Sequence, residues 1–166
     1  MKRYRVNHIF YSLQGEGHNT GRAAVFVRLA GCNLRCPFCD TEFETYHEMT
    51  AEDIVAEVIQ ISNLKSQTSN LLVVLTGGEP TLQVDEALVD LLHTRGYEVA
   101  MESNGTRPAP KNLDWLTVSP KLEHGAWRME HGICSAERGG KKPDEIKIVF
   151  DEDSEETLSS LPPQPS

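Results

Sequence analysis

Long apolar runs are absent from this sequence. No stretch approaches the roughly 18 consecutive apolar residues that a helix needs to span a bilayer. The N-terminal segment "MKRYRVNHIF" carries basic residues, but no long apolar stretch follows them, so it is not a secretory signal peptide. We therefore expect a cytoplasmic protein that does not bind a membrane.

An excess of positive charge is absent as well. The chain has 16 lysine and arginine residues against 25 aspartate and glutamate residues, which gives a net charge of −9. Because contacts with phosphates dominate affinity for nucleic acids, this balance argues against nucleic acid as a partner. The acidic run "DEDSEE" at 151–156 is most simply a solvated helix start.

Internal repeats are also lacking, and only the last six residues, "LPPQPS", resemble a linker. The chain has 166 residues, of which 39% are apolar and 25% charged, as is ordinary for a soluble globular protein. A chain of this length can bury a core without disulfide staples. We expect one domain, residues 1–166.

Strand and helix patterns alternate along the chain. Thr50 is the expected N-cap of the first helix, with Asp53 completing a capping box, and Gly96 is the expected C-cap of the second. This alternation predicts right-handed crossovers and a parallel sheet. The predicted strands are 23–31, 70–78, 97–105, 115–121 and 144–150, and the predicted helices are 50–64 and 85–96.

Polar and glycine-rich signals follow the predicted strands. A cysteine loop follows the first, and "TGGEP" (76–80), "ESNGT" (102–106) and "SPK" (119–121) follow the next three. In parallel α/β sheets and barrels this edge holds the active site. Five or six strands are too few for a barrel of eight. The predicted fold is therefore α/β, a partial and open parallel β/α barrel.

Three of the four cysteines stand within eight residues, Cys32, Cys36 and Cys39, in the spacing C-x3-C-x2-C. Disulfides among them are unattractive in a reducing cytoplasm, and clustered cytosolic cysteines more often bind metal. Three ligands would leave one iron of a [4Fe-4S] cluster open to a small molecule. A zinc knuckle with His47 as fourth ligand is the alternative. The distant Cys134 reads as a small, semi-buried thiol.

This cysteine motif, with an aromatic residue (Phe38) before its last cysteine, resembles that of the radical S-adenosylmethionine enzymes. The "TGGEP" segment resembles their glycine-rich motif, where the cofactor approaches the main chain closely. The resemblance implies that S-adenosylmethionine chelates the open iron. Reductive cleavage then yields a 5′-deoxyadenosyl radical, which abstracts hydrogen from the substrate.

The segment 9–41 further resembles the 7-carboxy-7-deazaguanine synthase family, through "SLQGEG" (12–17), "GRAAVFVRLAGCNLRC" (21–36) and "FCDT" (38–41). That resemblance implies ring contraction of 6-carboxy-5,6,7,8-tetrahydropterin to 7-carboxy-7-deazaguanine with loss of ammonia, on the route to queuosine. It also implies assistance by Mg²⁺, regeneration of S-adenosylmethionine, a homodimer, and an electron donor such as flavodoxin or ferredoxin.

Arg28 stands on an otherwise apolar strand, where its burial is costly unless it pairs with an anion, and a guanidinium suits a carboxylate. The resemblance assigns the other site residues by motif. Lys121 would neutralise the methionine carboxylate, and Thr41 would bind Mg²⁺. The expected cluster ligands are Cys32, Cys36 and Cys39; the expected cofactor-binding residues are Phe38, Cys39, Asp40, Gly78, Glu79, Ser119, Pro120 and Lys121; the expected substrate-binding residues are Leu13, Gln14, Gly15, Glu16, Arg28 and Thr76.

Two other functions remain open on the sequence. A glycyl-radical-enzyme activating enzyme shares the cysteine spacing, although it has no need of "LQGEG" or an inward Arg28. A zinc-stabilised interaction module is the alternative that is not an enzyme. Family members usually continue beyond a segment like "SLPPQPS" with one more strand and helix. We therefore expect this form to bind S-adenosylmethionine normally but to retain the pterin poorly.

Overall fold

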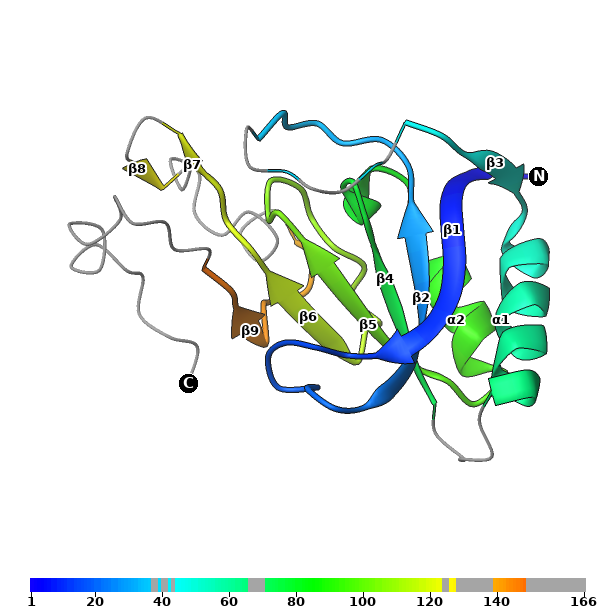
Figure 1. Cartoon of the computed structure of the whole chain (residues 1–166). Coiled ribbons are helices and arrows are strands. Elements are labelled where there is room, and N and C mark those ends of the chain that lie inside the picture. The colour runs from blue at the N-terminus through cyan, green and yellow to red at the C-terminus, as the bar shows by residue number, and fades with distance from the viewer. Residues whose placement is uncertain are drawn as a thin grey trace.

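The computed structural model describes residues 1–36, 39, 42, 44–65, 71–123, 126–127 and 139–148. Within these ranges one sheet has seven strands in the order β3-β1-β2-β4-β5-β6-β9 (Figure 1). Its strands are β1 (Tyr4–Leu13), β2 (Ala23–Leu29), β3 (His47–Met49), β4 (Leu72–Gly77), β5 (Glu98–Ser103), β6 (Trp115–Val118) and β9 (Glu145–Ile146). A separate hairpin joins β7 (Leu122–Glu123) to β8 (Ala126–Trp127).

The strands predicted from apolar runs form the parallel part of the sheet. Strand β2 pairs in parallel with β4, β4 with β5, β5 with β6, and β6 with β9. The sheet is open rather than closed, as the partial barrel requires, so the predicted fold class is confirmed. The described strands lie within the predicted ranges: β2 and β6 begin at the predicted residue, and the described part of each strand ends one or more residues before the predicted end.

The antiparallel strands β1 and β3 were not predicted. Strand β1 pairs antiparallel with both β2 and β3, and its register shifts between Val6 and His8. Because of this irregularity, the buried residues Tyr4, Val6 and Ile9 do not keep the period of two that marks a strand in sequence. Strand β3 has only three residues, too few for a periodic signal.

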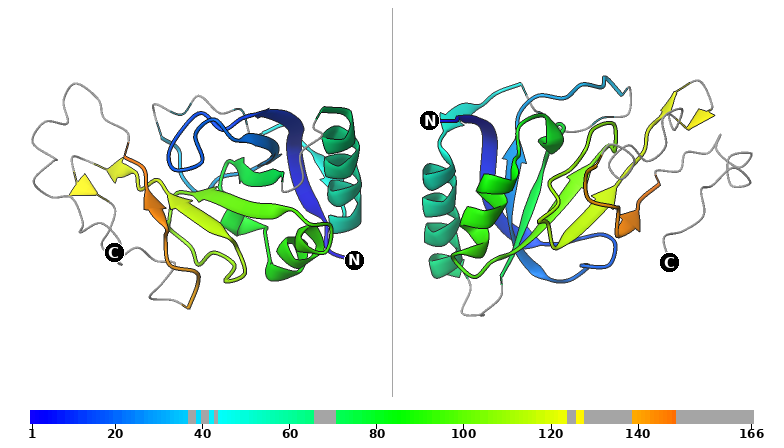
Figure 2. Two further views of the ribbon diagram at one scale, coloured as in Figure 1. Left: turned by 90° about the horizontal axis from the view of Figure 1, so that it is seen from below. Right: turned by 180° about the vertical axis from the view of Figure 1, so that it is seen from behind.

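Two helices, α1 (Ala51–Lys65) and α2 (Glu86–His93), lie on one side of the sheet, as Figure 2 shows from behind. The predicted capping box is present: the amide of Asp53 donates to Thr50 Oγ1 at 3.1 Å, and the amide of Thr50 donates to the Asp53 carboxylate at 2.9 Å. Gly96 follows α2 with a φ of 80°, the left-handed conformation that ends helices. A 3-10 turn, η1 (Pro80–Leu82), follows β4.

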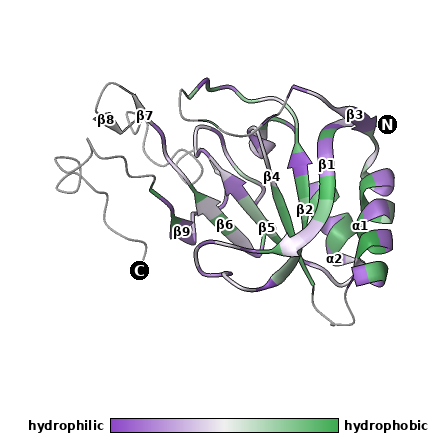
Figure 3. Ribbon diagram, viewed as in Figure 1, coloured by the Kyte–Doolittle hydropathy of each residue, from purple (hydrophilic) through white to green (hydrophobic). Residues whose placement is uncertain are grey.

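The two faces of the sheet differ in chemistry. The face under the helices buries the main apolar core, which includes Val25, Val27, Val73, Leu75 and Met101. In Figure 3, α1 is correspondingly hydrophobic toward the sheet and hydrophilic on its outer side. The opposite face has a smaller apolar cluster made of Ala24, Leu72, Val74 and Ala100. No described helix is long and apolar enough to cross a membrane.

Candidate functional site

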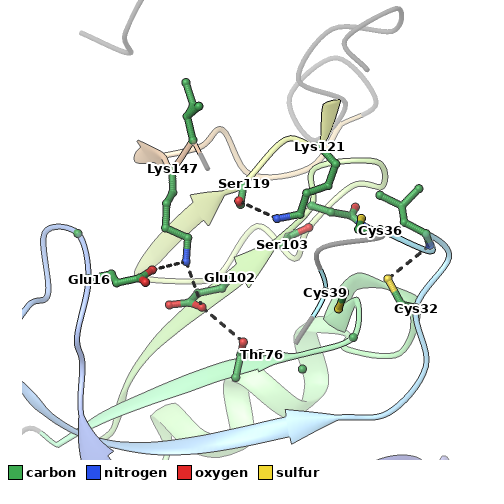
Figure 4. Close-up of a pocket in the computed structure, with 16 residues that line it drawn as sticks. Glu16, Cys32, Cys36, Cys39, Thr76, Glu102, Ser103, Ser119, Lys121 and Lys147 are labelled. Atoms are coloured by element: carbon green, nitrogen blue, oxygen red, sulfur yellow. Dashed lines mark hydrogen bonds and ion pairs between the residues drawn. The ribbon is translucent and has the colours of Figure 1, made fainter. Parts of the chain in front are cut away.

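A pocket of about 660 Å³ opens at the carboxyl ends of the parallel strands β4, β5 and β6 (Figure 4). This is the edge at which the sequence predicts the active site. Its described lining residues are Glu16, Gly17, Cys32, Leu34, Cys36, Cys39, Thr76, Gly77, Gly78, Glu102, Ser103, Asn104, Ser119, Lys121, Lys147 and Ile148.

The three motif cysteines all line this pocket, on the loop that follows β2. Cys32 and Cys36 are half-buried, whereas Cys39 is exposed. The amide of Leu34 donates to Cys32 Sγ at 3.4 Å. A peptide donor to a cysteine sulfur is one of the interactions that tune iron–sulfur clusters.

The zinc alternative needs a fourth ligand beside the three cysteines. Within the described residues, no group of three or more cysteine, histidine or carboxylate side chains is arranged to hold a metal ion. His47, the suggested fourth zinc ligand, lies exposed on the edge strand β3 and is not among the described pocket residues.

Gly77 and Gly78 let the end of β4 lie directly against the chain that leads to the cysteines. The amide of Gly78 donates to the carbonyl of Leu29 at 3.0 Å, and the amide of Glu79 donates to that of Gly31 at 2.9 Å. A Cβ on Gly77 would overlap the Leu29 backbone, and one on Gly78 would overlap Gly31. The sequence analysis explained these glycines by the close approach of the cofactor to the main chain. The structure adds a second reason, the close contact between two backbones.

Glu79 was predicted to bind the cofactor; its side chain is fully buried and is not among the described lining residues. One carboxylate oxygen accepts from the amide and hydroxyl of Thr81 at 3.0 and 2.5 Å and from the Ser103 hydroxyl at 2.8 Å. The other oxygen accepts from the amide of Asn104 at 2.7 Å. Through these hydrogen bonds Glu79 links the end of β4 to the end of β5.

We expect Glu79→Ala to lower the free energy of unfolding by about 3 kcal/mol or more, because each buried group left without a partner costs about 1–3 kcal/mol. Glu79→Gln should lose less, since its amide oxygen can still accept from Thr81 and Ser103. Urea unfolding of the three proteins, followed by circular dichroism, measures the differences. Equal stability of Glu79→Ala and the unmodified chain would contradict this role.

A group of charged and polar side chains fills the side of the pocket opposite the cysteines (Figure 4). Lys147 Nζ lies 2.7 Å from the Glu16 carboxylate and 3.8 Å from that of Glu102. Glu102 also accepts from Gln14 Nε2 at 2.8 Å and from the Thr76 hydroxyl at 3.4 Å. Burial acts to lower the pKa of Lys147, but the hydrogen bond to Glu16 and the nearby carboxylates raise it above its ordinary value.

Glu102 and Lys147 are pocket residues that the sequence did not assign to the site. Each is a charged residue within or next to a predicted apolar strand, in "VAMES" and "DEIKIVF". Charge within such a strand is the signal that singled out Arg28, and it applies equally to these two residues.

Lys121 and Ser119 also line the pocket, as predicted, and Lys121 Nζ donates to the Ser119 hydroxyl at 3.0 Å. Burial, the largest effect, and the neighbouring Lys147 lower the pKa of Lys121, while the three cysteine sulfurs oppose this shift. A half-buried ammonium beside the cysteine loop is suited to an anionic ligand. Pro120, between them, is buried and is not among the described lining residues.

Arg28 lies half-buried on β2, next to Thr76 of β4 in the sheet register. Its guanidinium carbon lies 5.4 Å from the centre of the Phe10 ring, a cation–π distance. Among the described residues no carboxylate pairs with it. The arginine is thus on the face opposite the helices, as an anion-binding role requires, although it is not among the described pocket residues.

The remaining predicted residues either lie outside the described pocket lining or fall outside the described part of the chain. Leu13 and Gly15 are exposed and do not line the pocket in its described part, and Gln14 reaches it through Glu102. Phe38, Asp40, Thr41 and Cys134 lie outside the described residues.

Comparison with known proteins places this site in a family. The model of the radical SAM superfamily matches residues 26–124. The chain is 46% identical over 149 residues to the 7-carboxy-7-deazaguanine synthase of Bacteroides thetaiotaomicron. The aligned region covers 89% of this chain and 70% of that relative. The chain belongs to the 7-carboxy-7-deazaguanine synthase family.

Two further similar proteins support this family membership. The 7-carboxy-7-deazaguanine synthase of Nitratidesulfovibrio vulgaris is 44% identical, with 89% of this chain and 71% of that relative covered. The crystal structure of QueE from Escherichia coli matches with a TM-score of 0.73 and 31% identity, over 95% of this chain and 75% of that one. The chain is therefore a radical S-adenosylmethionine lyase, and family membership implies a [4Fe-4S] cluster and S-adenosylmethionine.

Proposed function

We propose that this chain converts 6-carboxy-5,6,7,8-tetrahydropterin to 7-carboxy-7-deazaguanine with loss of ammonia, a step toward queuosine. One observation carries the proposal: the three motif cysteines and the Glu16–Lys147–Glu102 group line the same pocket. A substrate held by the charged group would lie beside a cofactor held near the cysteines, as hydrogen transfer between the two requires.

When bound, the cluster and S-adenosylmethionine supply a radical that abstracts hydrogen from the substrate. Cys32, Cys36 and Cys39 would hold the cluster. The main chain at Gly78 and the side chains of Ser119 and Lys121 border the adjoining space, where the Lys121 ammonium would neutralise the methionine carboxylate. Cys39 borders the same pocket, whereas Phe38, Asp40 and Pro120 are assigned to the cofactor through the family motifs alone.

On the substrate side, Glu16 and Gln14 offer an acceptor and an amide to the polar edge of the pterin ring, with main-chain groups from Leu13 and Gly15 beside them. Thr76 borders this part of the pocket and donates to Glu102. The Arg28 guanidinium would pair with the pterin carboxylate through two parallel hydrogen bonds.

Magnesium is part of the proposal, with Thr41 as its protein ligand. A neutral hydroxyl binds Mg²⁺ weakly, so substrate and water would complete the coordination. We expect Thr41→Ala to raise the magnesium concentration needed for full turnover, and Thr41→Ser to raise it less because the oxygen is retained. Magnesium titrations of steady-state turnover measure both. Superimposable titrations for Thr41→Ala and the unmodified chain would rule the ligand role out.

The proposed partners follow from the same chemistry. An external reductant such as flavodoxin or ferredoxin would supply the electron. Thiols that must stay reduced suit a cytoplasmic location. We propose a homodimer by resemblance to the family, which size-exclusion chromatography with light scattering tests.

Anaerobic turnover tests the proposed function. The reconstituted protein, given the carboxytetrahydropterin, S-adenosylmethionine, Mg²⁺ and a reductant, should release 7-carboxy-7-deazaguanine and ammonia in equal amounts while S-adenosylmethionine persists. A glycyl-radical activating enzyme would instead consume S-adenosylmethionine and leave the pterin unchanged. That second result, with a fully loaded cluster, would refute the proposal.

A further inference from the structure

The loop 14–22 closes the amino-terminal end of the parallel strands. It leaves β1 at Leu13, runs beneath β5 and β6 toward β9, and returns to begin β2 at Ala23 (Figure 1). Its base is joined where the amide of Gln14 donates to the carbonyl of Arg22 at 2.8 Å. The Arg22 guanidinium donates to both oxygens of Glu98, at the start of β5, at 2.8 and 2.7 Å. The base of the loop is thus fixed to the sheet.

The tip of the loop is held by a different residue, Glu145 of β9. One Glu145 oxygen accepts from the backbone amide of His18 at 3.1 Å. The other accepts from the Trp115 indole at 3.3 Å and from the Thr117 hydroxyl at 3.2 Å. A single carboxylate therefore joins the loop, β6 and β9.

Two further contacts lie beside this carboxylate. The imidazole of His18 stacks on the Trp115 ring, with centroids 4.3 Å apart and planes 15° from parallel. Gly17 has a φ of 68°, and a Cβ there would overlap the Glu145 carboxylate. This left-handed backbone conformation favours glycine. The loop tip and the Glu145 carboxylate are therefore in close contact.

Lys147, directly after β9, belongs to the pocket itself. It stands two residues after Glu145, and its amide donates to the carbonyl of Val118, which extends the pairing of β9 with β6. Lys147 pairs with Glu16, which stands two residues before His18 in the loop. Glu16 and Gly17 both line the pocket, whereas Glu145 is not among its described lining residues. Glu145 thus contacts the loop at Gly17 and His18, directly after the pocket residue Glu16.

We propose that Glu145 is a positioning residue for the pterin: its carboxylate holds the tip of loop 14–22 so that Glu16 faces the substrate. This inference rests on the proposed function, because it names how that substrate is held. The contacts that Glu145 makes among the described residues come from His18 of the loop and from Trp115 and Thr117 of β6. Loss of Glu145 should therefore affect pterin binding and spare S-adenosylmethionine.

The test compares Glu145→Ala, Glu145→Gln and the unmodified chain after anaerobic reconstitution. Small displacements of a positioning group can cost about 100-fold, so Glu145→Ala should raise the pterin KM about 10- to 100-fold. Iron content and the dissociation constant for S-adenosylmethionine should stay unchanged. Glu145→Gln retains one acceptor for the His18 amide and should recover part of the loss. Glu48→Ala, which removes an exposed carboxylate from the far edge strand β3, is the matched control and should behave as the unmodified chain.

Hydrogen–deuterium exchange provides a readout that does not depend on turnover. Because Glu145 accepts from the His18 amide, peptides covering loop 14–22 should exchange faster in Glu145→Ala and not in Glu48→Ala. If Glu145→Ala fails to fold, His18→Ala removes only the ring stacking and should show the same effects to a smaller degree. Unchanged exchange, or an equal loss of pterin and S-adenosylmethionine affinity, would overturn the inference. If exchange in loop 14–22 changes as expected in Glu145→Ala, but the unmodified chain does not convert the pterin, the proposed function is overturned instead.

Discussion

Replacing Cys36 by alanine should abolish product formation and most of the bound iron. Cys36 lines the pocket with Cys32 and Cys39, and each is expected to bind one iron of the cluster. Changes to residues that merely orient metal ligands already cost about 10- to 100-fold in metal affinity or activity, so the loss of a ligand should cost more. Cys32→Ala and Cys39→Ala should behave alike. Iron analysis, visible absorption and product assays on reconstituted protein measure the effect.

Cys134→Ala is the matched control, because it removes a cysteine that stands outside the motif. It should retain its iron and its turnover. The assignment of the ligands fails if Cys134→Ala loses as much iron as Cys36→Ala, or if Cys36→Ala keeps a full cluster.

Arg28→Ala should show the second large effect, a loss confined to the substrate. Removing one partner of a buried charge pair costs about 2–5 kcal/mol, which corresponds to about 30- to several-thousand-fold in pterin affinity. Slow cleavage of S-adenosylmethionine in the absence of pterin should persist, because the role proposed for Arg28 is confined to the substrate carboxylate. Steady-state kinetics with the pterin, beside 5′-deoxyadenosine release without it, separate the two effects.

Arg28→Lys sharpens this test. A lysine keeps the charge but cannot form two parallel hydrogen bonds with a carboxylate or present a flat group to the Phe10 ring. It should recover only a small part of the affinity. Near-normal turnover by folded Arg28→Ala would refute the role, as would full recovery in Arg28→Lys.

The parallel part of the fold could be predicted because each of its strands is a local signal. Strand β4, for example, is a continuous apolar run that ends at Gly77. Strand β1 carries no such signal, since its register shift places Val6 and Ile9 on the same buried side, three residues apart. Irregular pairing of this kind depends on the partner strand, which a local pattern does not reveal.

The candidate site likewise contains residues that the sequence could predict and residues that it could not. The cysteine spacing predicted that Cys32, Cys36 and Cys39 act together, the family resemblance added Lys121, and the structure brings all four to one pocket. The pairing of Lys147 with Glu16 joins residues 131 positions apart, and one sequence does not show it. The hydrogen bonds of the Glu79 carboxylate to Ser103 and Asn104 likewise join residues 24 and 25 positions apart, and its motif gave no sign of them.

Electron paramagnetic resonance of the reduced, reconstituted protein, recorded with and without S-adenosylmethionine, tests the central claim most directly. The claim is that three cysteines hold a [4Fe-4S] cluster whose remaining iron is open to that cofactor. The predicted result is a brown protein whose cluster signal changes when S-adenosylmethionine is added. A colourless protein with bound zinc, or a cluster signal that S-adenosylmethionine leaves unchanged, would contradict it.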